Sequence, residues 1–340
     1  MNFSRELQRW YDENRRAMPW RGISDPYKIW VSEIILQQTR VNQGWDYYLN
    51  FLCHFPTVEA LANGKEEEVL KVWQGLGYYS RARNMHAAAK TIMSQFKGKF
   101  PRNYDEILQL KGVGEYTAAA IASIAFGEFY PAIDGNFFRV ICRFYGIFDD
   151  IQLPATKKKV ADICQKLMHG TNPGEFNQAM MDFGATHCTP KQPLCQDCPF
   201  KEQCYAHLHQ AVEKLPVKIK KLKIKTRYFS FFCFVANNET LIAQRTGNDI
   251  WRGLYQLPMI EHETQNSETV RDFLHQWKHL SAPEYSVKHQ LTHQLILADF
   301  YLIQIKKLPV LHQNEVSVGF QDISNYPFPK IVADFFEKYV

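Results

Sequence analysis

Hydrophobic residues in the first two hundred positions recur three or four residues apart, the spacing of one face of an α-helix. Leu7, Trp10 and Tyr11 show this spacing in the first segment. Asp25-Pro26 supplies an N-cap and a first-turn proline for a helix that carries Ile29, Trp30, Glu33, Ile34 and Gln37. Short separators rich in Gly, Pro and Asn divide the remaining segments. Further helices are predicted over residues 41–55, 65–74, 80–96, 104–109, 115–126, 136–145 and 156–169. The pattern therefore predicts an all-helical N-terminal part.

The pattern changes after residue 227. Residues 228–236 (YFSFFCFVA) are β-branched and aromatic, Asn237-Asn238 favours a turn, and residues 240–244 return as the second strand of a hairpin. Later strands are predicted over residues 286–291 and 295–304, on either side of a turn at Thr292-His293. These elements predict a separate α+β domain.

Residues 214–227 (KLPVKIKKLKIKTR) join the two parts and hold seven basic residues and no acid. We interpret this stretch as an interdomain linker, either lying on a polyanion or serving as a solvated tether. The net charge of +5 is also unevenly spread. Residues 228–340 carry 9 Lys/Arg against 12 Asp/Glu, which leaves 31 against 23 for residues 1–227. The basic part points to a polyanionic partner, and ordinary solubilising surface charge is the alternative.

The composition bounds the class of protein. At 340 residues the chain has room for two domains, and its 46% hydrophobic content is that of a packed globular protein. No run of eighteen apolar residues predicts a membrane span. The first sixteen residues lack the apolar core of a signal peptide, so we expect a cytoplasmic, nucleoid-associated protein.

Four of the eight cysteines fall in one short segment with the spacing C-x6-C-x2-C-x5-C. Four thiolates can complete one tetrahedral sulfur site, for either Zn²⁺ or an iron–sulfur cluster. Structural zinc sites usually pair two short C-x2-4-C units, whereas both outer gaps here are wide. The spacing therefore favours one [4Fe–4S] cluster per chain over zinc, and over four unconnected thiols. The predicted ligands are Cys188, Cys195, Cys198 and Cys204.

A short glycine-containing turn joins two of the predicted helices. In Leu110-Lys111-Gly112-Val113-Gly114, two glycines permit a tight hairpin whose N–H groups lie at the start of helix 115–126. The dipole of that helix favours an anion there, such as a DNA phosphate. A plain helix–helix turn is the alternative.

At this point several motifs resemble a known family. LKGVGEYTAAAIA followed by Ile133-Asp134-Gly135-Asn136 resembles the helix–hairpin–helix DNA glycosylases, and the cysteine spacing resembles their iron–sulfur branch. Residues 19–21 (PWR), 31–39 (VSEIILQQT) and 75–81 (GLGYYSR) are similar to the adenine DNA glycosylase (MutY) family, whose members remove adenine mispaired with 8-oxoguanine. Residues 228–340 resemble that family's Nudix-like module without a Nudix hydrolase box, so we expect binding rather than hydrolysis.

The resemblance implies an architecture and a partner. It implies a mainly α helix–hairpin–helix glycosylase domain over residues 1–213 with a [4Fe–4S] loop, linker 214–227, and an α+β Nudix-like lesion-recognition domain over 228–340. Within the first domain it implies a six-helix subdomain over about 22–135 and a cluster subdomain of 1–21 with 136–213. The expected partner is double-stranded DNA with an adenine mispair, bound by a monomer in base excision repair.

Two carboxylic acids are the candidate catalytic groups. Breaking an N-glycosidic bond requires an acid for the departing base and a negative charge for the sugar. Glu33 lies on a largely apolar helix, where burial raises the pKa and keeps the acid protonated, although a structural buried Glu gives the same pattern. Asp134 is the sugar-side carboxylate, an N-cap, or both.

The resemblance also assigns supporting residues. It implies that Asn136 and Tyr116 support the charge of Asp134 and the reacting sugar. In glycosylase/lyase relatives a lysine stands at the position of Tyr116 and attacks the sugar; tyrosine does not form a Schiff base. The sequence therefore predicts a monofunctional glycosylase that leaves an abasic site.

Further positions are implied as substrate or DNA contacts. The residues that border the flipped adenine are Arg16, Trp20 and Gln178, and Arg21 is a further substrate or DNA contact. The residues at the opposite base are Gln38, Thr39 and Tyr78, and those of the hairpin are Lys111, Gly112, Val113 and Gly114. The lesion-reading loop contributes His289, Thr292 and His293. In the loop, Leu291-Thr292 replaces the usual Phe-Ser. A same-fold glycosylase for another base and a non-catalytic iron–sulfur redox sensor remain alternatives.

Overall fold

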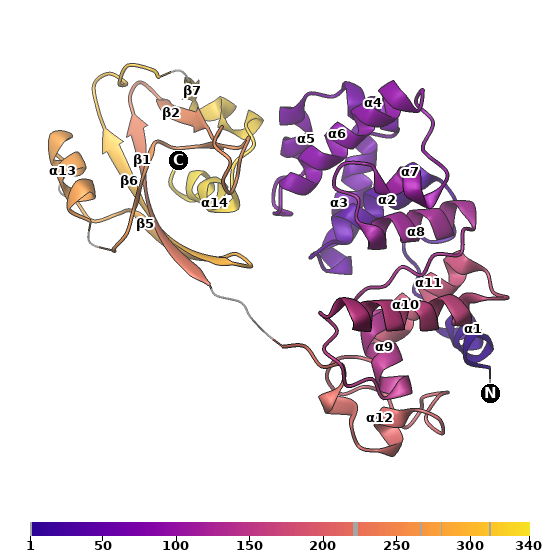
Figure 1. The fold of residues 1–340 in the computed structure, drawn as a ribbon. Helices are drawn as coiled ribbons and strands as arrows, with labels where there is room; N and C mark the ends of the chain where they lie inside the picture. The colour runs from indigo at the N-terminus through magenta and orange to yellow at the C-terminus, as the bar shows by residue number, and fades with distance from the viewer. Residues whose placement is uncertain (1, 220–223, 266, 280, 313) are drawn as a thin grey trace. The chain divides into compact units, whose positions relative to one another are not determined.

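The structure, a computed structural model, describes residues 2–219, 224–265, 267–279, 281–312 and 314–340. The chain separates into two compact units. The first unit contains Met1–Ala62 and Ala87–Lys220, and the second contains Asn63–His86 and Lys221–Val340. The first unit is helical, and the second adds β-sheet, so the fold class predicted from the sequence is confirmed (Figure 1). The domain boundaries predicted above stay a prediction.

The helices follow the hydrophobic pattern closely. α2 begins after the N-cap Asp25 with Pro26 in its first turn, and α8 begins after Gly114 and ends at Gly127 in the left-handed conformation. Short α4 and α12 and the longer α11 are additions to the predicted set. The helices up to residue 213 are α1 (Phe3–Asn14), α2 (Pro26–Leu36), α3 (Val41–His54), α4 (Val58–Asn63), α5 (Glu66–Val72), α6 (Ser80–Gln95), α7 (Tyr104–Leu108), α8 (Glu115–Phe126), α9 (Gly135–Tyr145), α10 (Pro154–Met168), α11 (Pro173–Asp182) and α12 (Tyr205–Leu208).

A π-helical turn, η1 (Phe183–His187), continues α11, and a 3₁₀ turn, η2 (Val212–Lys214), follows α12. Buried α2 lies at the centre of the first unit and packs against α3 and α8. α11 packs against α8, α1 and α9 (Figure 1). A second core, built on α1, α9, α10 and α11, includes Phe137, Phe176 and Phe183. The packing around α2 and this second core therefore meet along α11. The space between them is bordered by α2, α8, α9 and α11.

Within its described residues, the second unit adds two sheets and further helices. The strands are β1 (Lys225–Val235), β2 (Glu239–Gln244), β3 (Tyr255–Gln256), β4 (Met259–His262), β5 (Tyr285–Gln290), β6 (Gln294–Gln304) and β7 (Glu315–Gly319). One sheet has the order β4-β1-β6-β5, with β1 parallel to β6, and the other has the order β3-β2-β7. The helices are α13 (Glu268–Gln276), α14 (Lys330–Tyr339) and the 3₁₀ helix η3 (Phe320–Asn325).

The predicted hairpin of residues 228–244 is wrong in one respect. Asn237 and Asn238 do form a left-handed turn, with φ of 51° and 65°, and a single bridge joins Ala236 to Glu239. β1 and β2 then diverge into different sheets. Both faces of β1 are buried, so the strand pairs along its length with β4 and β6 rather than with its neighbour in sequence.

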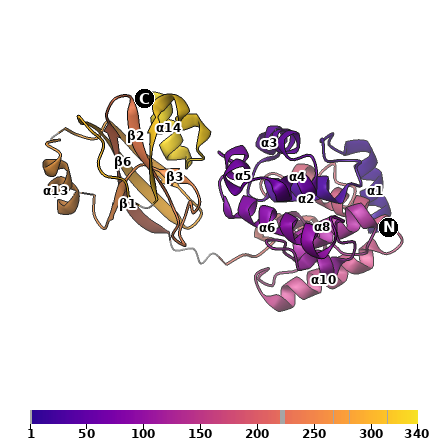
Figure 2. The same ribbon diagram turned by 90° about the horizontal axis from the view of Figure 1, so that it is seen from above.

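Alternate side chains of β1 pack into two different hydrophobic cores. Phe229 and Phe231 lie in a core with α14 and the second sheet, whereas Phe232 and Phe234 lie in a core with α13. The two helices consequently lie on opposite sides of the first sheet (Figure 2). This arrangement explains why residues 228–236 are continuously apolar rather than alternating.

Parts of the predicted linker, residues 214–227, have defined partners in the structure. The backbone oxygen of Val217 accepts a hydrogen bond from the N–H of Ile151 over 3.1 Å, and that of Ile219 accepts one from Gln152. β1 already begins at Lys225, and Arg227 is buried among Asp249 and Glu261 instead of facing a polyanion. Residues 220–223 of the predicted linker lie outside the described residues.

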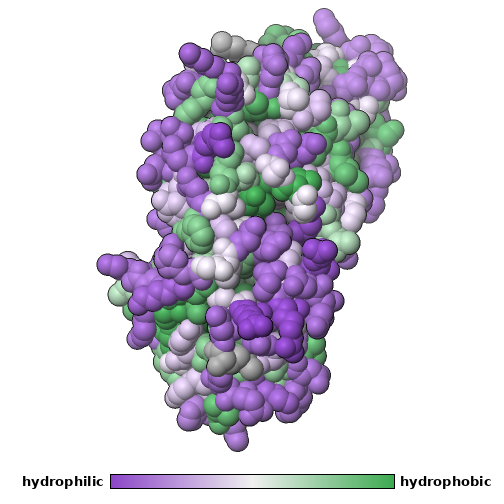
Figure 3. All heavy atoms as spheres, turned by 90° about the vertical axis from the view of Figure 1, so that its right-hand side faces the viewer, coloured by the Kyte–Doolittle hydropathy of each residue, from purple (hydrophilic) through white to green (hydrophobic). Residues whose placement is uncertain are grey.

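Among the helices of the described chain, none combines the length and apolar character needed to cross a membrane. On the face of the molecule in Figure 3, hydrophilic side chains predominate and hydrophobic ones gather only in small patches.

Candidate active site

A cavity of about 390 Å³ opens in the first unit where α2, α8, α9 and α11 come together. The stretch before α2 supplies a further wall. Ten of the residues predicted to act on the substrate or the DNA line this one cavity: Arg16, Trp20, Arg21, Glu33, Gln38, Thr39, Tyr116, Asp134, Asn136 and Gln178. The fold thus brings together residues spread over more than 160 positions of the sequence.

Glu33 is a buried acid on a buried helix. The side chains of Trp30, Val31 and Ile35 leave α2 almost no exposed surface, and Glu33 is only 8% exposed. Burial raises its pKa, and the negative charge of Asp134 raises it further. The hydrogen bond from Tyr116 and the charge of Arg21 lower it, but the net direction is upward. Glu33 is therefore poised to hold a proton at a pH where an exposed Glu has lost it.

Tyr116 is the immediate partner of Glu33. Its hydroxyl donates to Oε2 of Glu33 over 2.8 Å and also lies 3.7 Å from Sδ of Met181. Burial and the two nearby carboxyl groups raise the pKa of Tyr116 well above its usual value, so the hydroxyl remains a donor. The resemblance implied support for Asp134, whereas the hydrogen bond in the structure goes to Glu33.

Asp134 caps α9. Its Oδ1 accepts the backbone N–H groups of Asn136 over 2.8 Å and Phe137 over 2.9 Å, and its Oδ2 accepts the side-chain amide of Asn136 over 2.6 Å. Burial raises its pKa, while these hydrogen bonds and the charge of Arg139 oppose the rise. Three N–H donors stabilise the ionised form directly. The same carboxylate is thus an N-cap and a negative charge at the cavity wall.

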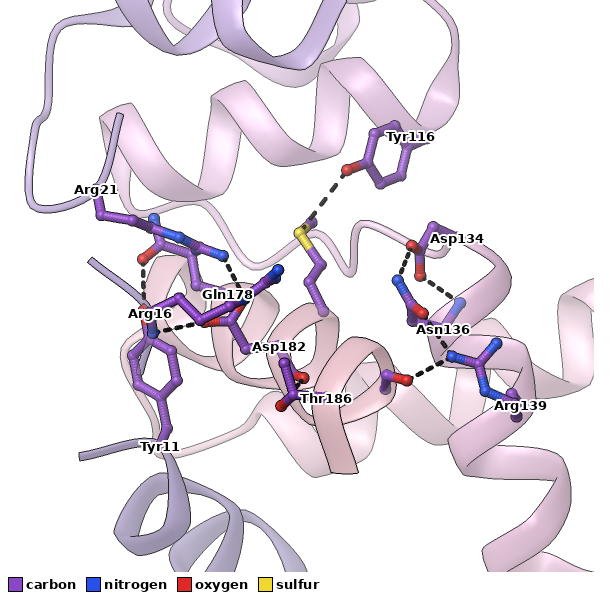
Figure 4. Close-up of polar contacts among 12 residues, drawn as sticks. Tyr11, Arg16, Arg21, Tyr116, Asp134, Asn136, Arg139, Gln178, Asp182 and Thr186 are labelled. Atoms are coloured by element: carbon purple, nitrogen blue, oxygen red, sulfur yellow. Dashed lines mark hydrogen bonds and ion pairs between the residues drawn. The ribbon is translucent and has the colours of Figure 1, made fainter. Parts of the chain in front are cut away.

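Arg139 connects this carboxylate to the cysteine segment. Figure 4 shows the part of the network that joins Asp134, Asn136 and Arg139. Its Nη2 donates to Oδ1 of Asn136 and to the backbone oxygen of Gly184, both over 2.6 Å, and its Nε donates to the backbone oxygen of Cys188 over 2.7 Å. Gly184 must be glycine, because a Cβ there would lie 2.5 Å from Cβ of Asn136. Neither Arg139 nor Gly184 was among the residues predicted from the sequence.

A second charged group lies behind two arginines that line the cavity. Buried Asp182, at the end of α11, binds the guanidinium groups of Arg16 and Arg21, and the hydroxyl of Tyr11 donates to Oε1 of Gln178 over 3.0 Å (Figure 4). Asp182 was not predicted from the sequence either. The one local signal for it is an Asp that directly follows the apolar residues Ala179, Met180 and Met181 at the end of the helix.

Gln38 and Thr39 reach the cavity through a sharp turn after α2. Gln38 has a φ of 59°, in the left-handed region that side chains with a Cβ seldom adopt. Gly112, in the hairpin between α7 and α8, has a φ of 81°, while Lys111 and Gly114 are exposed and Val113 is buried. The hairpin residues do not line the cavity.

The remaining predicted residues lie in the second unit. Tyr78, 46% exposed with a φ of 48°, shares a cavity of about 370 Å³ with Thr292 and His293, and its hydroxyl contacts that of Thr292. His289 does not line this cavity; it lies on β5 near Trp251, and burial lowers its pKa. The fold thus groups three of these four residues.

The four predicted cysteine ligands lie in one neighbourhood. Burial raises the pKa of Cys198 to about 12, and Cys188, Cys204 and Cys195 each add to the rise, so the four thiols are within electrostatic range of one another. Nη1 of Arg143 lies 3.5 Å from Sγ of Cys188. In the described chain, no three His, Cys, Asp or Glu side chains are grouped as ligands of a single metal ion. Four thiols in one another's range are the donor set that an iron–sulfur cluster requires.

Comparison with known proteins agrees with this geometry. A model of the HhH-GPD superfamily of base excision DNA repair proteins matches residues 31–169, and a NUDIX domain model matches residues 231–338. The adenine DNA glycosylase of Buchnera aphidicola subsp. Acyrthosiphon pisum (strain APS) is 36% identical over 264 residues, or 77% of this chain and 75% of that protein. The chain belongs to the adenine DNA glycosylase family.

Other members of the adenine DNA glycosylase family are similarly related. The protein of Buchnera aphidicola subsp. Baizongia pistaciae (strain Bp) is 31% identical over 94% of this chain and 90% of its own length. The human member is 40% identical over 63% of this chain and 41% of its own length.

Two solved structures resemble the helical part. A thermostable thymine-DNA glycosylase matches with a TM-score of 0.57 and 30% identity, covering 61% of this chain and 95% of that one. A non-covalent endonuclease III–DNA complex matches with a TM-score of 0.52 and 21% identity over 62% of this chain and 99% of that one, which shows the fold alone.

Proposed function

We propose that this chain is a monofunctional DNA glycosylase that removes adenine paired with 8-oxoguanine or guanine. The observation that carries the proposal is a pair of carboxyl groups in one cavity. Glu33 is buried with a raised pKa, whereas Asp134 accepts three N–H groups that favour its charge. Two carboxyl groups with different environments can serve as acid and as electrostatic stabiliser in the same reaction.

The reaction starts with an adenine rotated out of the duplex into the cavity. Glu33 donates its proton to a ring nitrogen of the adenine as the C1′–N9 bond breaks. The bonding electrons leave with the base, and the proton neutralises the charge that develops there. The hydrogen bond from Tyr116 keeps the carboxyl group of Glu33 oriented and leaves Oε1 to carry the proton.

Asp134 acts on the sugar. Loss of the base leaves positive charge on C1′ and the ring oxygen, and a fixed carboxylate at the cavity wall stabilises that charge. Because its oxygens are already held by Asn136 and Phe137, little reorganisation is needed during the reaction. Glu33, now ionised, accepts a proton from the water that adds to C1′, and an abasic site remains.

The absence of lyase chemistry follows from Tyr116. A Schiff-base mechanism requires an amine beside C1′, and a phenol with a pKa well above 10 offers neither an amine nor a phenolate. In the described chain no lysine lines the cavity. Strand cleavage at the abasic site is therefore left to another catalyst.

DNA is held by the parts around the cavity. The hairpin of residues 110–114 places the free N–H groups of α8 at a turn where Lys111 is exposed, and this combination suits a backbone phosphate. Gln38 and Thr39 border the opening and face the widowed partner base. In the second unit, Tyr78, Thr292 and His293 form the candidate reader of 8-oxoguanine, with His289 outside that group. We infer a monomer that engages one duplex.

A [4Fe–4S] cluster held by Cys188, Cys195, Cys198 and Cys204 completes the proposal. The thiols are close to one another, and the guanidinium of Arg143 lies beside Cys188. A positive neighbour and a cluster of thiols fit thiolate ligation. The cluster supplies rigidity to the segment that carries Lys191 and Lys201, and no step of base release passes through it.

Single-turnover base release tests the function. The rate of base release is compared among four duplexes. Three carry adenine opposite 8-oxoguanine, guanine or thymine, and the fourth carries thymine opposite guanine. Release of adenine from the first two and from neither control is expected. Release of thymine, the base named for the related thermostable enzyme, would instead assign the chain to another base. Binding of every duplex without release would favour a non-catalytic role.

A further inference from the structure

Asp182 is a buried charge that has no part in the mechanism described above. Its side chain has no exposed surface. Oδ1 accepts Nη2 of Arg16 over 2.5 Å and Nη2 of Arg21 over 2.9 Å, and Oδ2 accepts the backbone N–H of Arg16 over 3.3 Å. One carboxylate thus holds two guanidinium groups that come from the stretch before α2 (Figure 4).

This arrangement restricts both arginines. A carboxylate without access to water requires charged partners, and here the partners are those two side chains. Arg16 is 32% exposed and Arg21 only 14% exposed, so neither is a freely hydrated surface residue. Planar guanidinium groups bound at Nη2 keep their remaining N–H groups in fixed directions.

Those directions matter because both arginines line two cavities. Five residues border both the cavity of Glu33 and a neighbouring cavity of about 500 Å³: Arg16, Met18, Arg21, Ile124 and Gln178. These side chains therefore form a partition between the two spaces. Gln178 is itself fixed, since its Oε1 accepts from the hydroxyl of Tyr11.

The partition is rich in donors. A guanidinium offers only N–H groups, and the buried Nε of Arg21 has no hydrogen-bond partner within the residues that the structure describes. A donor of this kind is available to an acceptor atom that a bound nucleotide brings. The ring nitrogens of adenine and the sugar oxygens are acceptors, and an extruded nucleotide would bring them to this wall.

We propose that Asp182 is a positioning residue for base excision, holding Arg16 and Arg21 as a rigid wall whose N–H groups face the acceptor atoms of the extruded nucleotide. The inference rests on the proposed function of the same cavity. Asp182 touches neither the base nor the sugar, and it acts through the two arginines.

The first test is Asp182→Asn, which keeps the size of the side chain and removes its charge. The two guanidinium groups then lose their shared anion, and Arg16, the more exposed, turns toward water. We expect the single-turnover rate per active site to fall about 10- to 100-fold, the loss expected for a small misplacement of substrate-positioning groups. Affinity for fully paired duplex should stay unchanged.

Thr186→Val provides a matched control in the next turn. The hydroxyl of Thr186 binds the backbone oxygen of Asp182 over 2.9 Å, so this variant perturbs the same helix without touching the carboxylate. Its rate per active site should equal that of the unaltered protein. A drop as large as that of Asp182→Asn would assign the effect to helix packing and overturn the inference.

A double-mutant cycle separates positioning from general stability. In an Arg16→Ala, Arg21→Ala background, adding Asp182→Asn should change the rate less than about twofold, because residues acting as a unit are non-additive. The triple variant lacks the buried anion together with both of its cations. Its rate relative to the double arginine variant therefore tests the inference even if Asp182→Asn alone does not fold. If the effects of the substitutions on the rate are fully additive and the unaltered protein is active, this inference is wrong while the proposed function stands. An unaltered protein that releases no base defeats the proposed function as well.

Discussion

The hydroxyl of Tyr116 donates to Oε2 of Glu33 over 2.8 Å, and this hydrogen bond partly offsets the effect of burial on the acid. The bond favours the ionised form of Glu33, while burial, the larger cause, favours the protonated form. The pair thus sets how far above its usual range the pKa of the acid lies.

Tyr116→Phe removes the hydrogen bond and leaves the ring. Without the donor, the pKa of Glu33 rises further, so the acid stays protonated to a higher pH. The alkaline limb of the base-release rate should shift to higher pH. The maximal rate should fall about tenfold, because one hydrogen bond to a charged or reacting group contributes about 1.5 kcal/mol. A pH–rate profile under single-turnover conditions measures both effects, and a limb that moves to lower pH contradicts this account.

Glu33→Gln should abolish base release while stabilising the protein at neutral pH. The unfolded chain loses the proton of Glu33 near pH 4.5, whereas the folded chain keeps it to a higher pH. Folding then takes up a proton, and stability decreases with pH by about 1.4 kcal/mol per unit between the two pKa values. A glutamine side chain does not titrate, so the variant carries no such penalty.

Urea unfolding of the Glu33→Gln variant and of the unaltered protein at pH 4, 6 and 8 checks this sign. The variant's advantage should be small at pH 4 and grow toward pH 8. An advantage that is largest at low pH would mean that Glu33 is ionised in the folded protein. DNA binding should be retained throughout.

Asp134→Asn separates capping from catalysis. Asn caps helices as well as Asp does, so the melting temperature should change little. The lost negative charge at the sugar should slow base release about 100- to 1000-fold, as removal of a single electrostatic stabiliser does in other enzymes. A large loss of stability with normal release per active site would reduce Asp134 to a cap.

Gly184→Ala tests the close approach of η1 to α9. A Cβ would lie 2.5 Å from Cβ of Asn136, and the resulting displacement should cost about 1–3 kcal/mol. Because Asn136 donates to Asp134, base release should fall as well. Gly247→Ala is the matched control, since a Cβ there meets nothing within 4 Å. Thermal unfolding and single-turnover kinetics of both variants distinguish the outcomes.

Cys198→Ser should remove the proposed cluster. We expect loss of bound iron and sulfide and a weakening of DNA binding greater than the loss of helical structure. Cys53→Ser changes an exposed cysteine outside the quartet and should retain both metal and affinity. Chemical iron and sulfide analysis, circular dichroism and duplex titrations provide the three measurements. If DNA affinity is unchanged in the iron-free variant, the cluster is not needed for the cysteine segment to bind DNA.

Local signals in the sequence predicted much of the helical fold. The ends of α8 follow from Gly114 and Gly127, and Glu33 is recognisable because a lone acid on the apolar stretch IWVSEIIL must be buried. Long-range partners left no comparable signal. Nothing local to Asp182 indicates two arginines more than 160 positions upstream, and nothing in residues 228–244 indicates that two neighbouring strands part into different sheets.

Arg139 and Arg227 illustrate the same limit. Both are basic residues that a charge count assigns to the surface, yet both are at most 9% exposed. Arg139 is held by backbone oxygens and Asn136, and Arg227 by Asp249 and Glu261. Burial of a guanidinium depends on acceptors from distant segments, and these become visible only once the chain has folded.

The turn at Gln38 has a consequence for searches among other sequences. A residue with a Cβ in the left-handed conformation costs about 1–2 kcal/mol relative to glycine, so glycine is the expected occupant of such a turn. A position that local backbone energetics would give to glycine, but that holds a long amide, signals a task for the side chain. Mismatch between backbone preference and residue type can therefore select positions for mutational tests in chains where no catalytic motif has been recognised.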